Sequence, residues 1–288
     1  MASAPGEAAA PARGSHWDTG QVIHTDSAIR FRFGLTPLEE VKPWGAEPKL
    51  HWFGLTAGWY CVDIDGHEVL RYSERTVREL RYDRDGDRAH PYVDHFVVRL
   101  WEDVIALVSG AMEPVPHDLV DVAAAISPNW TWIDTPEADA ALTWHGEGYL
   151  YTDYLRVAPT IRLWRTVVGE EDTVTVGWEH RADPEGVIEF AGPQTGRVTL
   201  PTSEFLGAVA ELDRALLAAM DERIGELEKS GPPPGVRGDV EQLRREHRDR
   251  ATWLRRARDR EPGTDWDAVR TGARMLLAAG TRTQDDAG

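Results

Sequence analysis

The feature that most constrains this chain is a two-residue turn sequence between two stretches of alternating apolar residues. Residues 59–64 and 67–72 flank Asp65-Gly66, a pair favoured in a type I′ turn. Both positions of such a turn need a positive φ, which glycine and aspartate tolerate. The sequence therefore predicts a β-hairpin, and with it an antiparallel sheet in the N-terminal part of the chain.

The predicted turn fixes which side chains face each other across the two strands. Asp63 faces Glu68, and Cys61 faces Leu70. Two carboxylates in direct register repel each other, so the pair needs a bound cation, a shared proton that raises one pKa, or exposure at the hairpin tip. Asp63 and Glu68 are accordingly either an ordinary polar hairpin tip or a catalytic acid/base or metal-binding pair, assisted by a nearby histidine.

Alternation with a period of two predicts strands elsewhere in the chain. Before the hairpin, residues 29–33 and 50–54 follow this pattern. After residue 160 the pattern returns, and the predicted strands cover residues 161–167, 174–178, 187–191 and 197–200. Because short, turn-rich links join these later strands, they predict an antiparallel meander.

Apolar residues spaced by three and four predict the helices. Residues 93–108 show this spacing, and a short helix is predicted at residues 118–126. A long helix is predicted to start at Thr202-Ser203-Glu204, which offers a capping hydroxyl and an acidic first turn, and to stop at Gly231. Residues 240–260 and 266–279 predict two further helices, whereas the aromatic-rich residues 127–158 fit neither period.

These patterns predict an α+β fold with antiparallel sheets, comprising N-terminal hairpins and a later meander, packed by long helices and followed by a C-terminal helical appendage. Residues 1–27 lack apolar periodicity and are predicted to form a disordered tail. Residues 28–230 are predicted to be the α+β core, and residues 231–288 a C-terminal helical extension that begins at a proline-rich break.

Charge and cysteine content limit the classes of partner and compartment. The chain has 32 lysines and arginines against 49 acidic residues, a net charge of −17. This acidity disfavours nucleic acid and anionic membranes as partners and leaves a protein partner with a basic surface. Cys61 is the only cysteine, so an internal disulfide and a cysteine-based zinc site are excluded. Since the sequence also shows no secretory signal and no membrane-spanning run, a cytoplasmic location is expected.

Several short motifs are shared with a known family. They are IRFRFGLTPL at residues 29–38, VKPWG at 41–45, LHWFGLT at 50–56, PNW at 128–130, PTIRLW at 159–164 and LPTSEF at 200–205. On these motifs the chain resembles an uncharacterised protein family of actinobacteria over roughly residues 29–230. Because that family has no assigned activity, the resemblance implies a bacterial cytoplasmic setting and no catalytic residues.

Aromatic residues are concentrated between residues 130 and 164. Together with a few charged neighbours they could line a pocket with apolar walls, act as anchors of a protein interface, or fill the core. The predicted ligand-binding residues are Trp144, His145, Tyr151, Asp153, Tyr154, Arg162 and Trp164. The arginine-rich residues 244–260 offer a separate choice, between a docking surface for an acidic partner and an ordinary salt-bridged helix.

Two functions fit these observations. The first is a cytoplasmic, acidic binding or regulatory protein of immunity or interaction type. The second is a small-molecule enzyme, hydrolase-like, in which Asp63 and Glu68 act beside the aromatic pocket. A small-molecule ligand suits either function. No cofactor is predicted, because the chain carries no P-loop, dinucleotide-binding glycine pattern, zinc-protease helix or nucleophile elbow.

Overall fold

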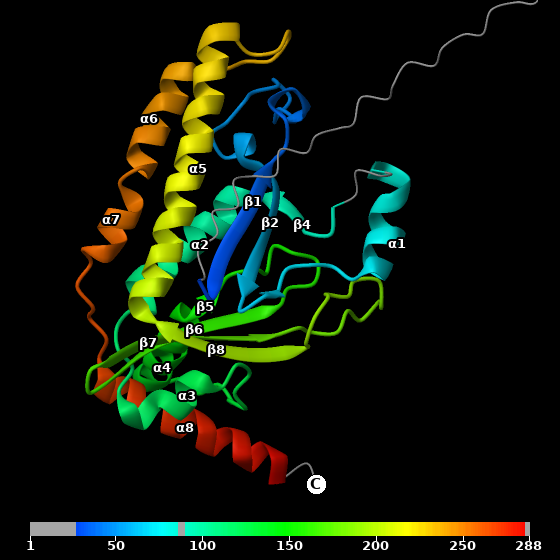
Figure 1. Ribbon diagram of the computed structural model, residues 1–288. Coiled ribbons are helices and arrows are strands. Elements are labelled where there is room, and N and C mark those ends of the chain that lie inside the picture. Colours follow the sequence, from blue (N-terminus) through cyan, green and yellow to red (C-terminus); the bar gives the residue numbers. More distant parts are fainter. Residues whose placement is uncertain (1–26, 86–89, 286–288) are drawn as a thin grey trace, which may run out of the picture.

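The computed structural model describes residues 27–85 and 90–285 (Figure 1). The predicted disordered tail, residues 1–27, lies outside these residues except for Ser27. The described part contains two antiparallel sheets and long helices, with further helices at its C-terminal end, so the predicted α+β fold is confirmed. No helix within the described part is long and apolar enough to cross a membrane.

The first sheet contains β1 (Ile29–Leu35), β2 (Ala57–Ile64), β3 (His67–Glu68) and β4 (Val93–Phe96), and β2 pairs antiparallel with each of the others. The predicted strand at residues 29–33 and the predicted hairpin are both confirmed. Asp65 and Gly66 have φ values of 50° and 79°, as a type I′ turn requires. Alternation places Phe31 and Tyr60 on the core face of this sheet, whereas Arg32 and Asp63 lie on its opposite, polar face.

The predicted strand at residues 50–54 is wrong. These residues lead into a short 3₁₀ helix, η2 (Gly54–Thr56), instead of pairing in a sheet. The apolar positions that suggested a strand are buried for another reason, since the Trp52 ring packs between Trp101 at 6.2 Å and the guanidinium of Arg250 at 4.3 Å. Residues 50–54 therefore show an alternating pattern because they wrap around the buried Trp52 ring, and not because they form a strand.

The second sheet has the order β5 (Tyr149–Leu150), β6 (Thr160–Val168), β7 (Glu171–Glu179) and β8 (Thr195–Pro201). All neighbours are antiparallel, which confirms the predicted meander. The predicted strand at residues 187–191 is wrong, because this stretch leaves the sheet and bonds to the chain just before α1 (Glu74–Asp85). The amide of Ser73 donates to the Glu189 carbonyl at 2.8 Å, and that of Ala191 to the Arg71 carbonyl at 2.7 Å.

The main core lies between the two sheets and is covered by α2 (Val97–Gly110) and α5 (Thr202–Ser230). The predicted helix at residues 93–108 starts later than expected, since residues 93–96 pair with β2 as β4. The long helix α5 and its end at Gly231, with φ 73°, are confirmed. Its predicted hydroxyl cap is wrong, because Pro201 occupies the N-cap and the Thr202 hydroxyl donates to Asp172 at 2.6 Å.

A second, smaller core lies on the far side of the second sheet (Figure 1). The short predicted helix at residues 118–126 is present as η4 (His117–Leu119) and α3 (Val120–Ala124). In the unclassified stretch, α4 (Pro136–Glu147) forms behind Thr135, whose hydroxyl caps the Ala138 amide at 3.2 Å. Both elements pack with Trp164 and with α8 (Trp266–Asp285).

The predicted helix at residues 240–260 is broken near Thr252 into α6 (Val240–Arg250) and α7 (Trp253–Arg258). In Figure 1 these helices run beside α5, and α8 lies below the second sheet. α6 contacts α5, α7 contacts α2, and α8 contacts α4. Leu243 of α6 and Leu254 of α7 are buried in the main core, so the C-terminal helices contribute to the packing of the molecule.

Candidate functional site

The Asp63–Glu68 pair lies on the polar face of the first sheet, and β2 and β3 place the two residues in direct register. Neither carboxylate is an exposed tip, since Asp63 is buried and the Glu68 side chain is 17% exposed. Asp63 Oδ1 accepts the Gly66 amide at 3.0 Å, which ties the carboxylate to the turn. The predicted register is therefore confirmed, and another feature must relieve the repulsion between the two charges.

Arginines from the neighbouring strand and loop provide that relief. Arg30 of β1 pairs with Asp63 at 2.6 Å, whereas Glu68 pairs with Arg32 at 2.8 Å and with Arg71 at 2.6 Å. The Tyr92 hydroxyl also donates to Glu68 Oε1 at 3.0 Å. Each carboxylate is thus neutralised by at least one arginine of the protein itself.

These contacts set the charge state of Glu68. Burial opposes its ionisation, but hydrogen bonds from Arg71 and Tyr92, together with the charges of Arg32 and Arg71, outweigh burial and hold the pKa of the carboxyl below its ordinary value. The same hydrogen bond with Glu68 raises the pKa of Arg71. Glu68 is therefore a fixed negative charge at neutral pH, suited to orienting a group and not to donating a proton.

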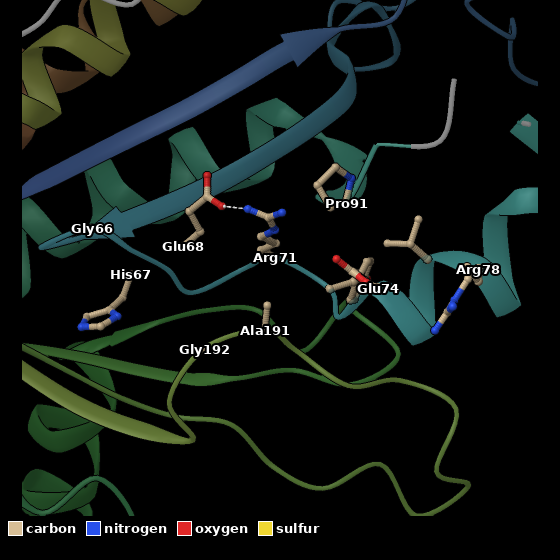
Figure 2. A pocket seen from close by; sticks show the side chains of 11 residues that line it. Gly66, His67, Glu68, Arg71, Glu74, Arg78, Pro91, Ala191 and Gly192 are labelled. Carbon is tan, nitrogen blue, oxygen red and sulfur yellow. Dashed lines mark hydrogen bonds and ion pairs between the residues drawn. The ribbon is translucent and has the colours of Figure 1, made fainter. Parts of the chain in front are cut away.

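Glu68 and Arg71 border a hollow of about 570 Å³ (Figure 2). Its walls come from the hairpin turn, the start of α1 and the loop before β8, which meet because residues 187–191 bond to the chain around Ser73. The lining residues are Gly66, His67, Glu68, Arg71, Tyr72, Glu74, Val77, Arg78, Pro91, Ala191 and Gly192. The volume falls in the range of about 300–1,000 Å³ typical of small-molecule sites. Asp63 does not belong to this lining.

Four of the predicted ligand-binding residues come together elsewhere, between the second sheet and α4. They are Trp144, His145, Arg162 and Trp164, and the space that Trp144, Arg162 and Trp164 line measures only about 10 Å³. A single water molecule needs at least about 10–15 Å³ of such space. The side chains therefore fill this region themselves, and their predicted ligand role stays a prediction.

Arg162 organises that packed region. Its guanidinium is buried and donates to the backbone carbonyls of Ala123, at 2.5 Å, and His145. It also lies 4.7 Å from the centre of the Tyr149 ring. Burial lowers the pKa of Arg162 to about 10, and burial beside that cation lowers the pKa of His145 to about 3. His145 is thus neutral at physiological pH.

The other three predicted ligand-binding residues lie on the loop after β5. Tyr151 and Asp153 are exposed, whereas the Tyr154 ring points into the main core and stacks on His95 at 4.4 Å. The Tyr60 hydroxyl donates to the Tyr154 hydroxyl at 2.9 Å, and Tyr154 in turn hydrogen bonds to Asp103 of α2. Burial, reinforced by the charge of Glu102, raises the pKa of Asp103 to about 7. The seven residues therefore do not share one site.

Sequence reasoning identified Glu68 but missed most of the residues around it. Arg71 and Arg78 are separated from Ala191 by more than a hundred positions, and only the unpredicted excursion before β8 brings them together. Asp103 was missed because it lies within an ordinary amphipathic helix, where one polar residue gives no signal. The arginines of β1 did carry a signal, since their alternation places them beside Asp63 once β1 and β2 pair.

The side chains that could bind a metal ion or act as a nucleophile limit the possible chemistry further. Among the side chains that the structure describes, no group of three or more histidine, cysteine, aspartate or glutamate residues is arranged to hold a metal ion. Cys61 is fully buried beneath the polar face, and burial raises the pKa of its thiol to about 12. A thiol with that pKa is a poor nucleophile at neutral pH.

Comparison with known proteins gives a family and no relative of known activity. Neither curated proteins nor solved structures yield a significant match. One family model does match, described as Family of unknown function (DUF5984), over residues 30–272. The match covers both sheets and continues past residue 230 into α8, further than the shared motifs indicated. The chain belongs to this family of unknown function.

Proposed function

We propose that this protein acts by binding, as a regulatory or interaction protein, and that the hollow beside Glu68 and Arg71 holds a small molecule. The observation that supports this proposal is the hollow itself, about 570 Å³ in volume and open between the hairpin, α1 and the loop before β8. It combines apolar walls with a few charged groups, the composition typical of small-ligand sites.

The charge states of the two carboxylates favour binding over hydrolysis. A hydrolase of the predicted kind needs one carboxyl that keeps a proton and one that accepts a proton. Glu68 is held ionised by two arginines, and Asp63 is paired with Arg30 outside the hollow. The pair therefore suits a fixed electrostatic frame better than a proton relay.

The acidity of the chain supports the proposed class of partner. With a net charge of −17, a protein partner with a basic surface would be attracted at long range, whereas nucleic acid and anionic membranes would be repelled. The single buried cysteine fits a reducing cytoplasm. The bound small molecule would then regulate or accompany contact with such a partner.

A ligand screen on the full chain tests the proposal. A library of small acids, phosphates, amines and neutral compounds would be tested by thermal shift, and hits confirmed by calorimetry. Ala191→Trp should weaken binding by placing a large ring in the hollow, whereas Ala218→Trp on the exposed face of α5 should leave binding unchanged. Hits that bind both variants alike would place the ligand elsewhere and contradict the proposal.

The same preparation separates binding from catalysis. Each confirmed ligand would be incubated with the protein and followed by mass spectrometry for conversion. Turnover that Glu68→Gln abolishes while binding persists would favour the hydrolase-like alternative, in which Asp63 and Glu68 act on a substrate. Binding without turnover is the expected result.

A further inference from the structure

Two charged residues that line the hollow have no partner of their own. Arg78 and Glu74 form no side-chain hydrogen bond and no ion pair with any residue the structure describes, although they lie one turn apart on α1. The other arginines of α1 with described side chains are both occupied. Arg75 pairs with Glu189 at 3.4 Å, and Arg81 pairs with Asp94 at 3.1 Å.

Arg71 adds a second source of unused donors. One guanidinium nitrogen, Nη1, contacts Glu68, and the side chain is still 45% exposed beside the hollow. The other N–H groups of the guanidinium have no partner among the described residues. In Figure 2, Arg71 lies beside Glu68, Glu74 and Arg78 lie toward the right on α1, and Ala191 and Gly192 lie below Arg71.

The unused charges have both signs, and this limits the ligand. A simple anion would satisfy Arg71 and Arg78 but would be repelled by the unpaired carboxylate of Glu74. A simple cation would satisfy Glu74 and would be repelled by the arginines. A molecule that carries an anionic and a cationic group a few bonds apart satisfies all three residues.

The rest of the lining supplies an apolar surface. The Val77 side chain, the Pro91 ring and the Ala191 methyl group line the hollow with the Tyr72 ring, which is held in place by stacking on Phe190 at 5.2 Å. An apolar group of the ligand would lose contact with water against these walls. The charged residues of the hollow therefore fit the polar end of a ligand, and the apolar residues fit its apolar end.

We propose that the hollow binds a small zwitterion with an apolar side chain, of the amino-acid class. Its carboxylate contacts Arg71 and Arg78, its ammonium contacts Glu74, and its side chain lies against Val77, Pro91 and Ala191. Charge-assisted bonds from guanidinium to carboxylate are the strong, geometrically specific contacts that such recognition uses. This inference rests on the proposed binding function and specifies the ligand of the same site.

The experiment compares ligands that differ by one charged group. Leucine, methionine and phenylalanine would be titrated into the full chain by calorimetry and NMR, together with 3-phenylpropionate, which lacks the ammonium, and 2-phenylethylamine, which lacks the carboxylate. At least one amino acid should bind, and phenylalanine should bind about tenfold or more tightly than either analogue. Failure of all three amino acids to bind, or equal binding of phenylalanine and its analogues, overturns the inference.

Two variants test which residue contacts the carboxylate of the ligand and which contacts its ammonium group. Arg78→Gln should weaken the binding of phenylalanine about tenfold and tighten that of 2-phenylethylamine, because a repelling cation is removed. Glu74→Gln should weaken the binding of phenylalanine and tighten that of 3-phenylpropionate, because a repelling anion is removed. The matched controls are Arg255→Gln and Glu222→Gln, both exposed on other helices and without side-chain partners in the described part, and they should change nothing.

The two proposals fail in different ways. If a ligand of another charge class loses binding in Ala191→Trp but not in Arg78→Gln or Glu74→Gln, the hollow is a binding site and only the zwitterion inference is overturned. If Ala191→Trp changes the binding of no ligand, the proposed function itself is overturned.

Discussion

Two regions of the molecule hold charged side chains in opposite ways. At the hollow, Glu68 lies between Arg32 and Arg71, and these contacts lower the pKa of the carboxyl and raise that of Arg71. In the interior, Arg162 and Asp103 form no ion pair with any described residue, and burial lowers the pKa of Arg162 to about 10 and raises that of Asp103 to about 7. Opposite charges thus strengthen ionisation at the hollow, whereas burial weakens it in the interior.

The difference teaches where space remains for a ligand. Large rings surround Arg162 and leave about 10 Å³, whereas the hollow of about 570 Å³ forms where small residues such as Gly66 and Gly192 meet. Aromatic density in a sequence therefore indicates packing as readily as it indicates a pocket. In this protein the larger space lies beside small and charged residues and not among the large rings.

The largest effect is expected from removing the buried arginine. Arg162→Ala deletes a large side chain among rings and leaves the carbonyls of Ala123 and His145 without a donor, so it should lower the free energy of unfolding by about 3–5 kcal/mol. Urea unfolding followed by tryptophan fluorescence measures it. Arg156→Ala, an exposed residue paired with Glu185, is the control and should cost less than about 1 kcal/mol. Similar losses in both variants would contradict the comparison.

A smaller, pH-dependent effect is expected at Asp103. Its pKa rises from 3.8 to about 7 on folding, so the folded state favours the protonated form. Stability from this group is complete below pH 4 and is lost as the pH rises through 7. Asp103→Asn cannot ionise. Its free energy of unfolding, relative to that of the unmodified chain, should therefore increase by about 1–2 kcal/mol from pH 5 to pH 8, after discounting for solvent screening. Urea unfolding at pH 5 and pH 8 tests this, and an equal difference between the two proteins at both pH values would contradict it.

The elements of the fold that could be predicted from the sequence are those set by local chemistry. The Asp65-Gly66 turn fixed the register of Asp63 and Glu68, and periodicity located α5 and the meander. The errors at residues 50–54, 93–96 and 187–191 have one cause. There, the partner of an apolar or extended stretch lies far away in the chain, and alternation does not say whether that partner is a strand, a ring or a loop.

The candidate site was predicted only in part for the same reason. Local register identified Glu68, but its neutralisation by Arg32 and Arg71 depends on the pairing of β1 with β2 and on the course of the chain after β3. Tyr154 was grouped with Trp144 because the two are close in sequence, yet their side chains enter different cores. Residues that are close in sequence can lie on opposite faces of a sheet, and their proximity does not show which face each side chain enters.

Glu68 sharpens the comparison from the side of the hollow. Glu68→Gln removes the charge that Arg32 and Arg71 share, and it should cost about 1 kcal/mol at pH 7 because the group is partly exposed. The pKa of Glu68 is lowered in the folded state, so its contribution is present above the unfolded value of 4.5 and is lost as the pH falls through the folded pKa. The cost of Glu68→Gln should therefore shrink as the pH is lowered from 7 to values below 4.5, measured by urea unfolding. A variant that is more stable than the unmodified chain at pH 7 would show that Glu68 behaves like Asp103.

The smallest effect is expected at Arg78, and it separates binding from stability most clearly. Arg78 has no partner in the described part of the chain, so Arg78→Ala should change the free energy of unfolding by less than about 0.5 kcal/mol. Arg81, one turn further along α1, is 5% exposed and contacts Asp94 and the His90 carbonyl, so Arg81→Ala should cost about 2–3 kcal/mol. Both values come from urea unfolding at pH 7. If Arg78→Ala destabilises the chain as much as Arg81→Ala, then Arg78 supports the fold; if stability is unchanged while ligand binding is lost, the residue's unpaired charge serves the hollow alone.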